Sequence, residues 1–369
     1  MKDYASLKSG TDIRGLAFGT DAPLDCDFAS RIGVAFVTWL SSRKKLPCTE
    51  LTVAIGRDSR ITGESLMSAC AEGMSRAGAR VLVFGLCTTP AMYMSIVTKG
   101  FEPDAAVMVT ASHQPQDRNG FKFFTASGGI SGDDVSALLE LAESAAVSSG
   151  TPGKIENCDF LSVYQEQLMS RVRIGLDDGG EQPLAGLHVV VDAGNGAGGF
   201  YAGMLMRLGA NVDGSRYLEP DGRFPYHIPN PENDAAMASI REAVLDSGAD
   251  LGVIFDTDCD RAAIVDGNGQ EINRNRLIAL ISAILLDKAP GATIVTDSVT
   301  SSGLSQFISE WGGIHYRFKR GYRNVIDEAV RLNSTGIDCP LAIETSGHAA
   351  LRENNFLDDW MYLETILIC

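Results

Sequence analysis

The chain has 369 residues, of which 45% are hydrophobic and 21% charged, and its formal net charge is −16. This length is typical of roughly two or three domains, and the composition is that of an ordinary globular protein. The negative charge would repel phosphate backbones, so we expect no nucleic-acid partner. The longest apolar run, residues 277–286, is too short to cross a membrane, and the start lacks a signal-peptide pattern, so we expect no membrane partner.

The eight cysteines are scattered along the chain without any Cys-x-x-Cys pair. This spacing is typical neither of a zinc site nor of a dense disulfide framework. A reducing compartment, the cytoplasm, is therefore the expected location.

Three segments, which begin near residues 51, 187 and 292, share one pattern of apolar strand, polar turn, amphipathic helix, glycine and second apolar run. This order is typical of a βαβ unit, so the sequence predicts an α/β fold of three consecutive, structurally related domains. A small, polar linker at 144–157 and a hairpin turn within 264–276 indicate the boundaries. We place the domains at 1–152, 153–271 and 272–369.

In the first of these domains, Ser112 follows the apolar run 105–109 and precedes Gly120 and Lys122. The side chains of sequence neighbours such as Ser112 and His113 usually diverge, and no Gly-x-Ser-x-Gly motif surrounds the serine. A hydrolase dyad is therefore not indicated. We expect Ser112 on a loop at a strand end, with Lys122 nearby.

The middle domain contains Gly-Asn-Gly-Ala-Gly-Gly at 194–199, after a strand, and an acidic residue, Asp213, follows about 20 residues later. The spacing matches a dinucleotide-binding fingerprint. It also suits a tight turn with close packing, which we favour because the equivalent turns of the other two domains lack these glycines. A nicotinamide-dependent oxidoreductase is kept as an alternative.

Three aspartates, Asp256, Asp258 and Asp260, alternate on a loop between two apolar runs. Such carboxylates repel one another unless a cation neutralises them. An EF-hand is excluded, because Arg261 and Gly267 occupy the positions where it needs glycine and glutamate. A hard divalent ion such as Mg²⁺, completed by a phosphate, fits better, and a serine that faces such a site is suited to carrying a phosphoryl group.

A third motif places Glu344, Ser346 and His348 at alternate positions after an apolar strand. In extended backbone, the three side chains would point to one side. We expect this row of carboxylate, hydroxyl and imidazole to bind the hydroxyls of a sugar.

Together, the motifs TASHQP, NGFKF, DTDCDR and ETSGH, preceded by GTDIRG and GRDSR and joined by FKRGYRNV, resemble the α-D-phosphohexomutase superfamily of the phosphomannomutase/phosphoglucomutase type. The resemblance spans essentially the whole chain. It implies mixed sheets sandwiched by helices. It also implies an Mg²⁺-dependent isomerase that interconverts hexose 1-phosphate and hexose 6-phosphate through a phosphoserine and a bisphosphorylated intermediate.

The resemblance also implies roles for individual residues. Ser112 would be the phosphoserine and, with Asp256, Asp258 and Asp260, would bind one Mg²⁺ per chain, with glucose 1,6-bisphosphate as activator. The other catalytic residues would be Arg14, Lys122, Arg261 and His348, and the substrate would contact Glu344, Ser346, His348 and Lys319. Either His348 or Lys122 could exchange the proton of the sugar hydroxyl.

The sequence departs from the family pattern at several places. Gln114 replaces an asparagine, whereas Thr257, Cys259 and Ile343 stand where glycine is common. We expect these changes to be tolerated if the backbone angles stay in ordinary regions. Family members also carry a smaller fourth C-terminal domain that grips the second phosphate. Because the sequence stops at Cys369, we expect this chain to lack that domain and therefore to show weak substrate binding and little turnover.

Two further alternatives remain open. His348 fits a phosphoglucosamine mutase as well as a mannose/glucose enzyme, and a catalytically silent sugar-phosphate-binding protein would need no fourth domain. The expected partner is a hexose phosphate in each case. The preferred hexose, and the choice between a monomer and a dimer, are left open by the sequence.

Overall fold

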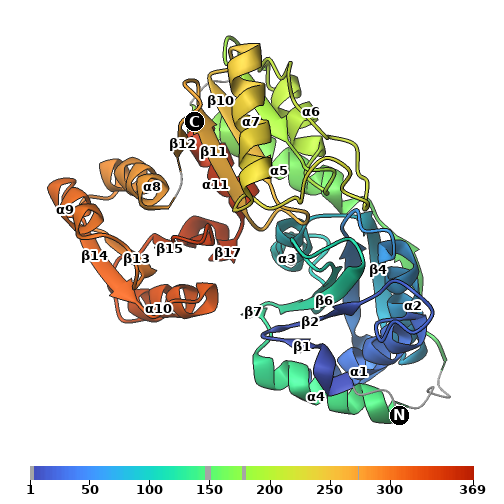
Figure 1. Ribbon diagram of the computed structural model, residues 1–369. Helices are drawn as coiled ribbons and strands as arrows, with labels where there is room; N and C mark the ends of the chain where they lie inside the picture. The colour runs from blue at the N-terminus through green and yellow to red at the C-terminus, as the bar shows by residue number, and fades with distance from the viewer. Residues whose placement is uncertain (1–3, 146–150, 177–179, 273) are drawn as a thin grey trace. The chain divides into compact units, whose positions relative to one another are not determined.

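The computed structural model describes residues 4–145, 151–176, 180–272 and 274–369 (Figure 1). These residues form two compact units, one comprising residues up to 166 with 194–198 and 219–229, the other comprising 167–193, 199–218 and 230–369. Residues 146–150 of the expected linker, and residue 273 of the expected hairpin region, lie outside the described residues. The domain boundaries at 152/153 and 271/272 stay a prediction.

The first unit is built on one mixed sheet with the strand order β1-β2-β6-β5-β3-β4-β8, and β7 pairs with β6. Strand β3 is parallel to β4 and β5, whereas β6 is antiparallel to both β5 and β2. The strands are β1 (Lys8–Ser9), β2 (Asp12–Leu16), β3 (Thr52–Arg57), β4 (Arg80–Leu86), β5 (Ala105–Val109), β6 (Arg118–Thr125), β7 (Gly128–Gly129) and β8 (Ile155–Asn157).

Helices α1 (Cys26–Lys44), α2 (Gly63–Arg76) and α4 (Gly132–Ser144) pack in one core against alternate residues of these strands, and α3 (Thr89–Val97) contacts β3, β5 and β6. Short 3-10 turns lie at Tyr4–Leu7 and Cys48–Glu50. Two glycines allow α1 and α2 to pack closely: a Cβ on Gly33 would lie 2.3 Å from the Cys70 carbonyl oxygen, and one on Gly73 would lie 2.0 Å from that of Ser30. Even alanine would push the two helices apart.

The second unit contains two further mixed sheets within the described residues. One has the order β12-β11-β10-β9 and the other the order β14-β13-β15-β16-β17, each with parallel and antiparallel pairs. The strands are β9 (Val189–Asp192), β10 (Leu251–Phe255), β11 (Ala262–Asp266), β12 (Glu271–Ile272), β13 (Thr293–Asp297), β14 (Ile314–Phe318), β15 (Leu341–Ile343), β16 (Ala349–Leu351) and β17 (Leu357–Asp358).

Helices alternate with these strands along the chain. They are α5 (Phe160–Gly175), α6 (Phe200–Arg207), α7 (Asp234–Ser247), α8 (Asn275–Lys288), α9 (Ser302–Glu310), α10 (Tyr322–Ser334) and α11 (Trp360–Ile368), with a 3-10 turn at Arg352–Asn354. Among the residues described, no helix combines the length and apolarity that crossing a membrane requires. The predicted fold class, three related α/β domains with mixed sheets, is confirmed.

The glycine-rich turn at 194–199 has a packing role. Gly194 has a φ of +51°, and a Cβ on Gly199, just before α6, would lie 1.9 Å from the Leu218 carbonyl oxygen. These positions therefore require glycine because of backbone conformation and close approach, without any bound dinucleotide.

Candidate active site

Ser112 stands just beyond the end of the buried strand β5, on the loop that leads to β6. Its side chain is 2% exposed, and its φ of +52° lies in the left-handed region that L-residues rarely adopt. The Ser112 and His113 side chains do not diverge as their adjacency suggests, because Oγ of Ser112 lies 3.3 Å from Nδ1 of His113. Strained backbone of this kind persists only where surrounding contacts enforce it.

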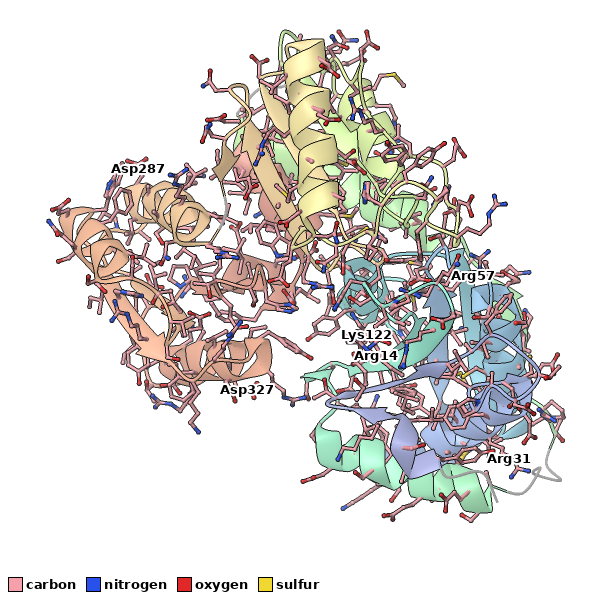
Figure 2. The ribbon with its side chains drawn as sticks, viewed as in Figure 1. Arg14, Arg31, Arg57, Lys122, Asp287 and Asp327 are labelled. Atoms are coloured by element: carbon pink, nitrogen blue, oxygen red, sulfur yellow. The ribbon has the colours of Figure 1, made fainter. Side chains whose placement is uncertain are left out.

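Two basic residues of the expected site come from the neighbouring strands of the same sheet (Figure 2). Arg14 on β2 pairs in register with Gly120 on β6, and Lys122 follows two residues later on the same face of β6. Lys122 is 6% exposed, and Arg14 forms an ion pair of 2.7 Å with Asp12. The Thr110 amide donates to the Gly120 carbonyl (3.0 Å), so the start of the Ser112 loop and both cations share this end of the sheet.

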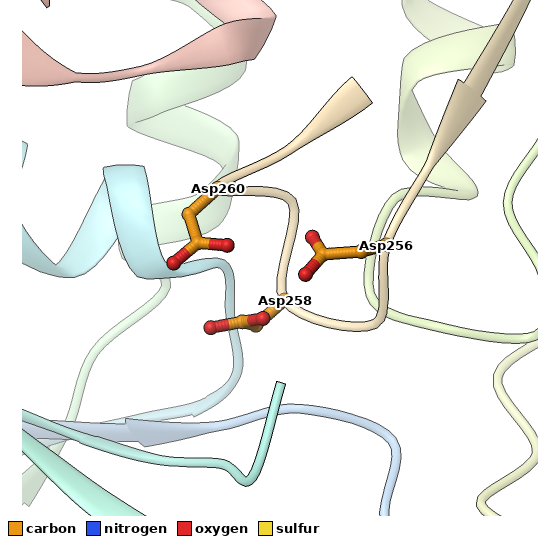
Figure 3. Close-up of side chains that lie close together, drawn as sticks. All are labelled: Asp256, Asp258 and Asp260. Atoms are coloured by element: carbon orange, nitrogen blue, oxygen red, sulfur yellow. The ribbon is translucent and has the colours of Figure 1, made fainter. Parts of the chain in front are cut away.

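The three aspartates of the second unit lie on the turn between β10 and β11 and converge there (Figure 3). One carboxylate oxygen from each of Asp256, Asp258 and Asp260 lies within 4.8 Å of the others, and all three residues are buried. Buried carboxylates this close repel one another strongly, and hard oxygen donors are the ligands that Mg²⁺ prefers. The donor set therefore fits a hard divalent cation.

Arg261 ends this turn and supplies its positive charge. Its Nη2 donates to Asp256 (2.8 Å), and its Nε lies 3.7 Å from Asp260. Burial opposes the charge of the Arg261 guanidinium, but Asp256, Asp260 and Asp258 raise its pKa above the usual value. One cation thus offsets part of the charge of three carboxylates.

Cys259 does not meet the condition of ordinary backbone angles on which the tolerance of these departures depends. Its φ is +64°, and its amide donates to the Asp256 carbonyl (3.3 Å) to close the turn. Glycine adopts a left-handed φ most readily, so the buried Cys259 occupies this position at a conformational cost.

The expectation that Glu344, Ser346 and His348 follow one another in extended backbone was also wrong. Strand β15 ends at Ile343, and residues 344–348 form the turn of a hairpin, in which Gly347 has a φ of +102° and the Glu344 amide donates to the His348 carbonyl (2.8 Å). The turn still gathers polar groups, because Ser346 Oγ donates to Glu344 (3.2 Å). Burial raises the pKa of the Glu344 carboxyl, although the hydrogen bond that the Gly321 amide donates to it acts to lower the pKa.

His348 is held from two sides. Its Nδ1 lies 2.5 Å from Asp358 on β17, and its ring stacks on Tyr322 at 5.0 Å between centroids. Burial lowers the pKa of the imidazole, but Asp358 outweighs that effect and raises the pKa to about 8. With Nδ1 directed at a carboxylate, Nε2 is the atom left to face a ligand.

Replacing Asp358 with asparagine is expected to lower the pKa of His348 from about 8. The nearest carboxylate that favours the imidazolium is then lost, while the burial that disfavours it remains. NMR titration of the histidine Cε1 protons measures the change. Asp338→Asn, which removes a carboxylate that pairs with Arg352, should leave the pKa of His348 in place, and an unchanged pKa in Asp358→Asn would contradict the assignment.

Lys319 follows β14 and is exposed, with Nζ 5.7 Å from the centre of the Phe318 ring. Within each unit, then, the structure gathers expected residues: Arg14 and Lys122 at the sheet end that leads to Ser112, the three aspartates with Arg261, and Glu344 with Ser346. The participation of Ser112 in metal binding and the contact of Arg261 with a phosphoserine join the two units and stay predictions.

Sequence reasoning missed Arg60, Asp58, Asp358 and Tyr322, each of which contacts an expected residue or its loop. The GRDSR motif contains the first two, but only as part of the family pattern. No residue-based signal connected Asp358 with His348, ten positions away.

Comparison with known proteins agrees with this arrangement. A fold of related α/β domains, with a buried serine at a strand end and a turn of converging aspartates, is that of a phosphohexomutase. Models described as phosphoglucomutase/phosphomannomutase, alpha/beta/alpha domains I, II and III, match residues 6–146, 163–269 and 273–365. The chain belongs to the phosphoglucomutase/phosphomannomutase family, whose members are intramolecular phosphotransferases.

Individual relatives show the same similarity. The chain is 33% identical to phosphomannomutase/phosphoglucomutase of Pseudomonas aeruginosa over 360 residues, 97% of this chain and 72% of that protein. It is 31% identical to phosphoglucomutase of Neisseria gonorrhoeae over 312 residues, which cover 84% of this chain but only 64% of the relative. A crystal structure of a family protein from Burkholderia thailandensis matches with a TM-score of 0.84 and 30% identity, and covers 100% of this chain and 77% of that one.

Proposed function

We propose that the protein is a phosphohexomutase that interconverts the 1-phosphate and 6-phosphate of mannose or glucose, with Ser112 as the residue that carries the phosphoryl group. The observation that supports it most is the turn of three buried carboxylates within 4.8 Å, accompanied by a single buried guanidinium. Such a cluster has no evident purpose in packing, whereas phosphoryl transfer depends on a metal and on cations that hold spreading charge.

In the proposed transfer, a sugar hydroxyl attacks the phosphorus of phospho-Ser112. The bond between phosphorus and Ser112 Oγ breaks as the bond to the sugar oxygen forms, and the hydroxyl proton passes to a base while Oγ regains a proton. The resulting bisphosphate reorients and returns its other phosphoryl group to Ser112. The cycle consumes no net phosphate. Glucose 1,6-bisphosphate can phosphorylate the serine before the first cycle.

The residues of this chain have separate roles in the proposed transfer. Arg14 and Lys122 offset the negative charge of the transferring group, as preorganised cations do. Glu344 and Ser346 bind ring hydroxyls through an acceptor and a donor, and Lys319 offers a cation to the substrate. The proton goes to one of two groups, His348 or Lys122.

Asp256, Asp258 and Asp260 would hold the metal, for which we propose Mg²⁺. When bound, it would act as a Lewis acid that polarises the phosphoryl oxygens. We also propose that the protein acts in the cytoplasm. The eight free cysteines support this location, because thiols persist in a reducing compartment.

The test is the phosphorylation of Ser112. The purified protein is incubated with Mg²⁺ and glucose 1,6-bisphosphate, and intact mass and peptide mapping are recorded before and after. We expect one phosphate on Ser112 in the wild type, none in Ser112→Ala, and normal uptake in Ser127→Ala, which removes an exposed serine elsewhere in the first unit.

Absence of phosphate on Ser112 under every condition would refute the mutase and favour the catalytically silent sugar-phosphate-binding protein. If Ser112 is phosphorylated, the rates of its dephosphorylation by mannose, glucose and glucosamine 6-phosphate identify the preferred sugar. A clear preference for glucosamine 6-phosphate would replace the proposed substrate with that of a phosphoglucosamine mutase.

A further inference from the structure

One buried guanidinium organises the loop that carries Ser112. Nη2 of Arg60 donates to the carbonyl oxygens of Ser112 (2.5 Å) and Gln114 (2.6 Å), and its Nη1 donates to those of Pro115 and Arg118 (2.8 Å each). Arg60 is 1% exposed. Four carbonyl groups, three in the loop after β5 and one on the first residue of β6, therefore converge on one cation. Hydrogen bonds from a charged donor are roughly twice as strong as neutral ones.

Asp58 completes the arrangement beneath the loop. Its carboxylate lies 3.3 Å from Nε of Arg60 and accepts a hydrogen bond from Thr110 Oγ1 (2.6 Å). The same Thr110 oxygen accepts from the Ser112 amide (2.8 Å). Ser112 is thus bound at its N–H by Thr110 and at its C=O by Arg60.

These two contacts explain the backbone of Ser112. Fixing the N–H on one side and the C=O on the other restrains both torsions of the residue, and this keeps φ at +52° in the otherwise unfavourable left-handed region. The conformation in turn sets the direction in which Oγ points. The strain is local to Ser112, and its cause lies in Arg60 and Asp58, which precede it by about fifty residues.

The segment 219–229, which belongs to the same compact unit, lies against Arg60. The Phe224 ring centre is 5.4 Å from Arg60 Cζ, and a Cβ on Gly222 would lie 2.5 Å from the Ile61 amide nitrogen and the Ser59 carbonyl oxygen. This close packing shields the guanidinium from water, and the ion pair and hydrogen bonds are stronger in that low-dielectric setting.

We propose that Arg60 is the positioning residue of Ser112, and that its guanidinium holds Oγ in the direction required for in-line phosphoryl transfer. This proposal rests on the proposed function. Arg60 acts through the backbone, because its Nη atoms bind carbonyl groups of the loop. A lysine cannot replace it, since an ammonium group has three donors and lacks the planar fork that reaches four carbonyls.

The test compares Arg60→Lys with the wild type and with Arg80→Lys, which alters an exposed arginine of the same unit that pairs with Glu156. Initial rates of Ser112 phosphorylation are measured over a range of glucose 1,6-bisphosphate concentrations with Mg²⁺. We expect the maximal rate of Arg60→Lys to fall about 100-fold, as misplacement of a reacting atom by about 1 Å can cause, with an unchanged half-saturating concentration. Arg80→Lys should match the wild type.

A second variant separates positioning from folding. Arg60→Ala leaves a cavity of guanidinium shape, so added guanidinium or methylguanidinium ion should restore much of the phosphorylation rate, whereas an ammonium ion should not. An equal maximal rate in Arg60→Lys and the wild type, or a failure of rescue in a folded Arg60→Ala, would overturn the assignment.

Hydrogen exchange keeps the proposal testable even if the wild type takes up no phosphate. The amide of Ser112 should exchange at least about tenfold faster in Arg60→Lys than in the wild type or Arg80→Lys, because the loop loses its anchor. Equal exchange in the three proteins would refute Arg60 as the positioning residue. If the wild type takes up no phosphate, the mutase is refuted. Faster exchange of the Ser112 amide in Arg60→Lys would then still retain the role of Arg60 in the loop.

Discussion

Asp258→Asn is expected to abolish phosphoryl transfer and, in the same molecule, to stabilise the metal-free protein. Asp258 is fully buried between two other carboxylates, and a single guanidinium accompanies the three. Removing one negative charge relieves repulsion in the absence of a cation. It also removes a ligand, and because a metal supplies several kcal/mol of charge stabilisation, the rate of Ser112 phosphorylation should fall on the order of 1,000-fold or more.

Thermal unfolding in EDTA and in excess Mg²⁺ separates the two effects. A ligand at about 100 times its dissociation constant stabilises the folded state by roughly 2.7 kcal/mol, so Mg²⁺ should raise the melting temperature of the wild type. In EDTA, Asp258→Asn should melt above the wild type, and Mg²⁺ should change it little. Asp287→Asn, at an exposed position on α8, makes the same change of charge and should respond to Mg²⁺ as the wild type does.

An equal gain of melting temperature on adding Mg²⁺ to Asp258→Asn would show that the aspartate turn does not hold the metal. Uptake of phosphate by this variant at the wild-type rate would remove the turn from the mechanism altogether.

The aspartate turn could be predicted from sequence because all of its chemistry is local. Asp256, Asp258 and Asp260 follow one strand and precede the next, so short-range geometry alone brings their carboxylates together. The position of Ser112 after β5 was predictable for the same reason. Three repeats of the strand, helix and strand pattern likewise specified the fold class, because periodicity is a property of short segments.

The surroundings of Ser112 could not be predicted in this way. Arg60 binds four backbone carbonyls, and carbonyl groups are present at every residue, so nothing in the letters of the loop identifies a guanidinium more than fifty positions earlier as its partner. The contact between Asp358 and His348 depends on the antiparallel pairing of β16 with β17, in which Asp358 lies opposite Ala350, two residues beyond His348.

The row of Glu344, Ser346 and His348 was predicted with the wrong backbone geometry. Alternation predicts extended backbone, but a glycine at position 347 in the left-handed region allows a hairpin turn instead. The chain forms a turn here in place of a continuous strand, because β16 pairs antiparallel with β15.

Glu364→Met is expected to raise the free energy of unfolding at neutral pH. Glu364 lies on α11 and is fully buried, and neither of its carboxylate oxygens has a hydrogen-bond partner among the residues that the structure describes. Burial raises the pKa of this carboxyl well above its ordinary value of 4.5, because an apolar environment disfavours the charged form. An unsatisfied polar group in an apolar site costs roughly 1–3 kcal/mol, which methionine of similar shape would remove.

The dependence on pH identifies the cause. The pKa of Glu364 is higher in the folded than in the unfolded protein, so its contribution to stability is full below pH 4.5 and declines as the pH rises toward the folded value. The loss of stability between pH 5 and pH 8, measured by urea unfolding, should therefore be larger for the wild type than for Glu364→Gln. Glutamine mimics the neutral acid at both pH values. Glu310→Gln, at an exposed position on α9, should keep the wild-type difference.

The two substitutions at residue 364 then separate the contributions of charge and of polarity to the loss of stability. The gain from glutamate to glutamine at pH 8 measures ionisation alone, and the further gain from glutamine to methionine measures the buried polar atoms. Equal losses between pH 5 and pH 8 for the wild type and Glu364→Gln would mean that the carboxylate finds a partner in solution.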